Sequence, residues 1–140
     1  MMNSSATVSA ELGLSLVVPE HGSVPLVASL FYSADDPYAI RMAFHVGADE
    51  PVEWIFARDL LAVGLEGPAG EGDVQVWPAD EDGHELLNIA LSSPFGEAHF
   101  EAPRSSTAAF LARTYEVIAP GHESDYIDVD TELDELLWRA

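Results

Sequence analysis

The sequence contains no cysteine and no lysine. The absence of cysteine excludes disulfides, thiolate catalysis and cysteine-ligated metal sites. No uninterrupted apolar run approaches the roughly 20 residues that a membrane helix needs. Residues 1–8, MMNSSATV, lack the basic and apolar regions of a secretory signal. We therefore expect a cytoplasmic protein without membrane insertion.

Positive charge is also scarce, since five arginines stand against 25 acidic residues and give a formal net charge of -20. The acids are spread along the chain, and residues 67–103 hold eight of them and no arginine. Nucleic-acid affinity depends on cations that replace counterions at phosphates, and anionic membranes also attract basic segments. The composition therefore disfavours both partners and predicts a solvated acidic surface.

Seven segments carry strand patterns. In residues 7–18, apolar side chains alternate with small or polar ones, which is typical of a half-buried strand. Further strands are expected at residues 26–33, 40–46, 52–56, 74–77, 86–92 and 97–102. Turns are expected at residues 34–37, 47–51, 78–84 and 93–96, where proline, glycine and aspartate gather.

Three helices are expected between and after these strands. Residues 58–63 form a short helix, with Gly64 placed to cap its C-terminus. A second helix begins near Pro103 and ends before Pro120. A last helix, capped by Asp130 or Thr131, carries the apolar stripe Leu133, Leu136 and Leu137. The order predicts one α+β domain over residues 1–140, with an antiparallel sheet of about seven strands, a short helix mid-chain and two C-terminal helices.

No catalytic motif emerges from the polar residues. The glycines at 67, 70 and 72 lack the lysine that a phosphate-binding P-loop requires, so we expect them to shape a connection between helix and strand. The five histidines lack the spacing that brings metal ligands together. Acidic pairs such as Glu97 and Glu101 are expected by chance in so acidic a chain. The sequence predicts no enzyme and no cofactor.

An acidic segment near the C-terminus resembles the start of an EF-hand loop through Asp128, Asp130 and Glu132. The sixth position would have to be glycine and the twelfth glutamate, but they are Leu133 and Arg139. We expect no dedicated metal site, and weak divalent-cation binding stays open.

Three blocks together resemble one family: residues 52–65 (VEWIFARDLLAVGL), 72–78 (GDVQVWP) and 90–98 (ALSSPFGEA). Weaker likenesses occur at residues 36–39, 110–114 and 128–133. By these motifs the chain resembles the SsgA-like proteins of sporulating actinomycetes, most of all their SsgB-type branch, from about Val8 to Leu137.

The resemblance implies a role in sporulation-specific cell division. It implies that the chain positions septa and recruits the tubulin-like protein FtsZ, with SsgA-type relatives as further partners, at septum sites in the cytoplasm. It also implies a fold similar to the whirly and mitochondrial guide-RNA-binding proteins, assembled as a homotrimer. The alternative, a whirly-type binder of single-stranded nucleic acid, is disfavoured by the net charge.

For the partner-binding surface we select Arg58, Asp59 and Leu60, at the start of the expected short helix. The competing interpretation is that this region belongs to the core, which we favour for Trp54 and Leu61. Because the partner would itself be acidic, we expect docking through apolar contact rather than long-range attraction.

Overall fold

The computed structural model describes residues 7–45, 50–70, 72–94 and 96–126. Its elements are β1 (Thr7–Val18), β2 (Gly22–Ser33), β3 (Asp36–His45), β4 (Val52–Ala57), α1 (Arg58–Gly64), β5 (Val74–Glu81), β6 (His84–Ser93), β7 (Gly96–Pro103), α2 (Arg104–Val117) and a 3-10 turn, η1 (Glu123–Tyr126). None of the helices in these ranges is long and apolar enough to cross a membrane.

All seven strands belong to one antiparallel sheet in the order β4-β3-β2-β1-β7-β6-β5. The alternation in the sequence sets which face each strand buries. In β1, Val8, Leu12 and Leu14 are buried, while Ser9, Glu11 and Gly13 between them are exposed. Since side chains alternate across a strand, one face of the sheet carries the core and the other meets solvent.

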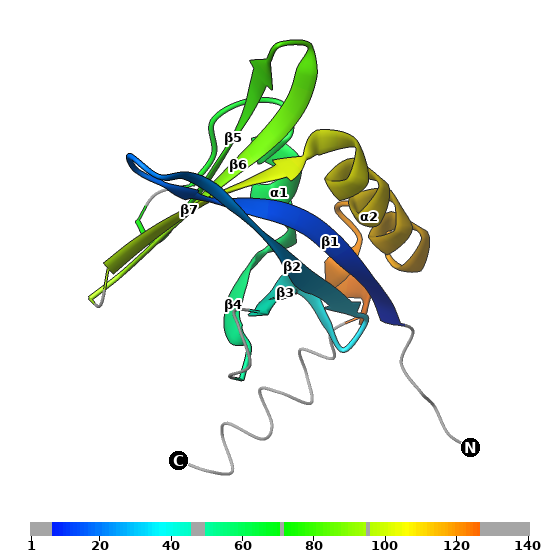
Figure 1. Ribbon diagram of the computed structural model, residues 1–140. Helices are drawn as coiled ribbons and strands as arrows, with labels where there is room; N and C mark the ends of the chain where they lie inside the picture. The colour runs from blue at the N-terminus through cyan, green and yellow to red at the C-terminus, as the bar shows by residue number, and fades with distance from the viewer. Residues whose placement is uncertain (1–6, 46–49, 71, 95, 127–140) are drawn as a thin grey trace.

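The sheet curls into a half-barrel. Phe44 of β3 and Phe100 of β7 stack with ring centroids 4.3 Å apart, although β2 and β1 separate their strands in the sheet. The bend falls where β1 meets β7, because only Ser15 with Glu101 and Leu16 with Phe100 are in register there. Figure 1 shows the β5–β6–β7 layer turned away from the long β1–β2 hairpin.

Two helices cover part of the inner face. α2 packs on β1, β6 and β7, and its buried residues Thr107, Phe110, Leu111 and Thr114 follow the helical period. α1 contacts β3 and β4 at one edge of the sheet and β5 at the other. In Figure 1 it lies between the two halves of the sheet, with α2 beside β1. The fold is therefore α+β, as predicted, with a seven-stranded antiparallel half-barrel and two helices.

Three of the expected boundaries are wrong. β3 begins at Asp36 rather than at residue 40, so the expected turn over residues 34–37 is shorter than predicted. The expected turn over residues 78–84 is only the pair Asp82-Gly83, whose φ values of 51° and 82° suit a tight hairpin turn. β5 therefore continues through Pro78. The N–H of Val76 points outward to Ala69, away from β6, and the nitrogen of Pro78, two residues further along this edge strand, lies on the same outer side, where the ladder to β6 needs no donor. β2 begins at Gly22 rather than Leu26 and runs through Pro25.

Gly64 does not act as the expected helix cap. It is the last residue of α1, and Leu65 is the C-cap residue. A Cβ on Gly64 would lie 2.7 Å from Cβ of Val76, so glycine is needed for close packing of α1 on β5. The expected helix after Asp130 lies outside the described residues.

Candidate docking surfaces

Arg58, selected from the sequence as a partner-binding residue, lies in the interior with 1% of its surface exposed. It opens α1, and its side chain points toward the end of α2. Its Nη1 donates to the carbonyl oxygens of Ile118 at 2.7 Å and Thr114 at 3.3 Å. These acceptors belong to the C-terminal end of α2 and the residue after it, where helix carbonyls lack partners within the helix. Arg58 therefore ties α1 to the end of α2.

An ion pair and two aromatic rings complete the surroundings of this guanidinium. Its Nη2 contacts the Glu123 carboxylate at 2.8 Å, and its Cζ lies 4.8 Å and 5.0 Å from the ring centres of Tyr32 and Tyr115. The hydrogen bond from Arg58 holds the pKa of Glu123 below its ordinary value. Burial raises the pKa of the Tyr115 hydroxyl, and the charge of Arg58 opposes that shift.

The other two selected residues differ from Arg58 in exposure. Asp59 is exposed and Leu60 is half-buried. Of the three selected residues, only these two present side-chain surface to a partner, and their role in binding stays a prediction. Leu61 is buried, as expected, and Trp54 is half-buried against the core. A single arginine among apolar neighbours was the one sequence signal that could have indicated an internal role for Arg58.

An apolar groove of about 320 Å³ lies on the concave face of the sheet. The Phe44–Phe100 stack contributes to its lining, together with Leu16, Leu26, Val52, Trp54, Leu91 and Ala98 among others. Val52, at the outer strand of the sheet, is 52% exposed. The groove therefore offers aromatic and aliphatic surface to another molecule, and the motifs in the sequence did not reveal it because its residues come from six strands.

Strand β4 exposes apolar side chains on both faces. Val52 and Trp54 line the concave groove, whereas Ile55 faces the other side and is 65% exposed. Ile55 pairs in register with Arg41, which stacks over Phe31 with Cζ 4.7 Å from the ring centre. Among the strands that the structure describes, β4 is the outermost at this end of the sheet, and such an edge strand is a common docking element.

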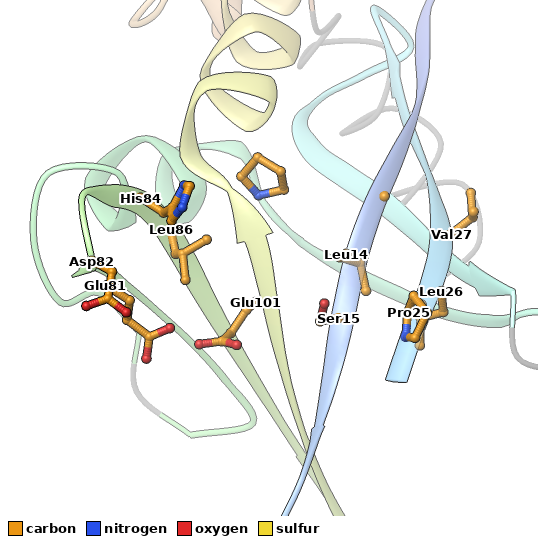
Figure 2. A pocket seen from close by; sticks show the side chains of 12 residues that line it. Leu14, Ser15, Pro25, Leu26, Val27, Glu81, Asp82, His84, Leu86 and Glu101 are labelled. Carbon is orange, nitrogen blue, oxygen red and sulfur yellow. The ribbon is translucent and has the colours of Figure 1, made fainter. Parts of the chain in front are cut away.

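A third surface is a cleft of about 660 Å³ beside the bend of the sheet. Figure 2 shows Leu14, Pro25, Leu26 and Val27 on the side of β1 and β2. On the opposite side lie the carboxylates of Glu81, Asp82 and Glu101 with His84. One wall is thus aliphatic, and the other combines carboxylates with Leu86.

The glycine-rich connection and several histidines make contacts that belong to the fold. The glycine-rich connection folds onto β5, where Ala69 and Val76 exchange backbone hydrogen bonds of 2.8 and 2.9 Å. The histidines reach separate partners, such as Ser29 for His45 and Asn88 for His99. Within the described ranges no three His, Asp or Glu side chains gather closely enough to hold a metal ion. The EF-hand-like segment lies outside those ranges.

Comparison with known proteins assigns the chain to a family. Residues 26–123 match the family model described as Streptomyces sporulation and cell division protein, SsgA. The sporulation-specific cell division protein SsgB of Thermobifida fusca is 57% identical over 137 residues, which cover 98% of this chain and 99% of that protein. SsgB of Streptomyces coelicolor is 51% identical over 133 residues, which cover 95% of this chain and 97% of that protein.

A solved structure supports the same assignment. The SsgA-like sporulation-specific cell division protein from Thermobifida fusca superimposes with a TM-score of 0.86 at 57% identity, over 96% of this chain and 98% of that one. The chain therefore belongs to the SsgA family of sporulation and cell division proteins, which confirms both the family resemblance and the non-enzymatic character predicted from the sequence.

Proposed function

We propose that this chain acts in sporulation as a scaffold that helps to position division septa and recruits FtsZ through protein contacts at septum sites in the cytoplasm. Relatives that match it over nearly their whole length are named sporulation-specific cell division proteins. The observation that best supports docking is the uncovered concave groove, which presents Trp54 and Val52 on a half-barrel that the helices cover only in part.

Apolar contact is the interaction that suits this groove. The chain carries a formal net charge of -20, and FtsZ proteins are acidic too, so long-range electrostatics oppose the encounter. Salt screens such repulsion. We therefore expect binding to stay constant or strengthen as the salt concentration rises.

The test is a pull-down of purified FtsZ by the purified chain at low and high salt, with two variants on β4. Val52→Gln places a polar group in the groove, whereas Ile55→Gln changes an exposed residue on the opposite face of the same strand. We expect only Val52→Gln to weaken capture. Capture that falls steeply with salt, or equal effects of the two substitutions, would contradict docking in the groove.

Asp59 and Leu60 of α1 remain proposed partner contacts in addition to this groove. Asp59→Asn and Leu60→Gln should weaken capture of FtsZ if α1 takes part in docking. Arg58 would act indirectly, because its buried side chain holds α1 and α2 together. Normal capture by both α1 variants would confine docking to β4 and the groove.

We also propose that the chain, as one domain over residues 1–140, forms homotrimers and joins SsgA-type relatives. Charge repulsion between copies requires a largely apolar interface. The β4 edge, with exposed Val52 and Ile55, suits this better than the β5 edge, which carries Pro78 and ends in acidic residues. Light scattering at physiological salt measures the oligomeric state, and a monomeric mass would refute the proposed homotrimer.

The likeness to whirly proteins remains part of the proposal for the fold alone. A nucleic-acid role does not follow from it, since the four arginines in the described ranges are already engaged: Arg41 with Glu53, Arg58 with Glu123, Arg104 with Glu66 and Arg113 with the Ser9 carbonyl. Fluorescence anisotropy with oligonucleotides at low salt should show no binding.

A further inference from the structure

The cleft of Figure 2 exists because the ladder between β1 and β7 stops. After Ser15 pairs with Glu101, continuing it would bring Gly13 next to Pro103, which has no N–H to donate. Gly13 adds no side chain, and a Cβ at this position would meet no atom within 4 Å. The space between the two halves of the sheet therefore stays open to solvent beside the bend.

Its two walls differ in chemistry. Pro25 and Val27 of β2 form an aliphatic wall, and Val27 is 42% exposed there. Leu14 and Leu26 also border the cleft, but they alternate toward the core face of the sheet. Glu81, Asp82 and Glu101 supply carboxylates on the side of the β5–β6 hairpin. The volume of about 660 Å³ lies within the range of about 300–1,000 Å³ of pockets that hold drug-sized ligands. That is enough for a short stretch of extended peptide.

No cation from the described part of this chain neutralises the acidic wall. Arg104 follows Pro103 directly, but its Nε donates to the Leu65 carbonyl at 3.0 Å and its Nη2 contacts Glu66 at 3.1 Å. The arginines at 41, 58 and 113 have partners elsewhere. The carboxylates are also too dispersed to form a metal site within the described ranges. A ligand that matches this cleft therefore carries spaced positive charges beside aliphatic groups.

We propose that this cleft binds a short peptide segment of a partner protein in which arginine or lysine side chains alternate with aliphatic ones. In an extended segment, successive side chains point in opposite directions, so the basic ones reach Glu81, Asp82 and Glu101 while the aliphatic ones pack on Pro25 and Val27. Leu26 lines both this cleft and the concave groove, but Glu81, Asp82 and Glu101 line only the cleft. Variants of these carboxylates therefore test the cleft independently of the proposed recruitment of FtsZ. Unlike docking in that groove, binding here should weaken as salt rises.

The test uses fluorescence polarisation with a fluorescein-labelled hexapeptide that alternates arginine with leucine. We expect saturable binding to the full chain at low salt. Peptides that alternate arginine with serine, or glutamate with leucine, should bind at least about tenfold more weakly, because each engages only one wall. Equal binding of the arginine–serine peptide would show plain charge attraction and overturn the proposal, as would absence of binding.

Two kinds of variant locate the site. Glu81→Gln/Glu101→Gln removes two charges from the cleft, and Glu20→Gln/Glu116→Gln removes two exposed charges elsewhere. Each exposed ion pair contributes up to about fivefold in affinity, so the cleft variant should weaken binding about tenfold and the control less than about twofold. Gly13→Ile fills the cleft without changing charge and suits a strand, and it should also weaken binding about tenfold. Equal effects of the two charge variants, or normal binding by the correctly folded Gly13→Ile variant, would refute the site.

Discussion

The buried guanidinium of Arg58 gives the sharpest prediction about stability. Replacing Arg58 by alanine removes the hydrogen bond of 2.7 Å to the Ile118 carbonyl and the contact of 2.8 Å with Glu123. Removing one partner of a buried ion pair costs about 3–5 kcal/mol. Because the Glu123 side chain keeps 15% of its surface exposed and so regains some hydration, we expect a loss near the lower limit, about 3 kcal/mol.

Urea denaturation followed by circular dichroism measures this loss, which should lower the melting temperature by about 10 °C for a chain of this size. The matched control is Arg41→Ala, since Arg41 and Glu53 form a pair of 3.5 Å with both side chains 51% exposed. Exposed pairs contribute about 0–1 kcal/mol. A loss below about 1 kcal/mol for Arg58→Ala, or equal losses for the two variants, would refute the structural role of Arg58.

Other predictions concern the same region and the packing of α1. Arg58 lowers the pKa of Glu123 in the folded protein, so below pH 5 the unfolded chain binds protons more readily than the folded one. The stabilisation by this pair is therefore lost as the pH falls through the lowered pKa. Urea denaturation from pH 7 to 3 should show a smaller decline in the free energy of unfolding for Glu123→Gln than for wild type, and parallel declines would contradict the prediction. Gly64→Ala forces a Cβ against Val76 and should lower the free energy of unfolding by about 1–3 kcal/mol. The control is Gly67→Ala, where a Cβ meets no atom within 4 Å and the change should be less than about 0.5 kcal/mol. Equal losses for the two variants would show that close packing does not explain the glycine at position 64. Arg58→Lys keeps the charge but not the planar fork of donors, so its stability should fall between those of wild type and Arg58→Ala, and a wild-type value would mean that charge alone suffices.

The local sequence pattern predicted most of the strands and helices. Alternation placed all seven strands, and Pro103 and Pro120 bounded the segment that forms α2. The errors in the turns arose because each proline was interpreted as the end of a strand. Both Pro25 and Pro78 lie within strands. Pro78 is tolerated because its nitrogen faces the outer side of the edge strand β5, and the strand order is not visible in one sequence. The Asp82-Gly83 pair was the available signal for the true turn.

The docking surfaces were harder to foresee. Arg58 was selected because it is charged and adjoins a short helix, yet its acceptors at Thr114 and Ile118 are more than fifty residues away. Residues far apart in sequence also form the apolar groove and the acidic cleft, which depend on the curl of the sheet. The family motifs predicted a non-enzymatic division protein, but they could not indicate which side chains face outward.

Composition and periodicity by themselves determined the acidic character of this protein, its α+β class and its lack of thiol chemistry, because these depend on residue type and on local repeat. Only the tertiary structure decided that Arg58 lies inside, that Gly64 is needed for contact with Val76, and that an open cleft forms beside the bend. Each of these depends on which strands become neighbours, and that is set by packing of the whole chain.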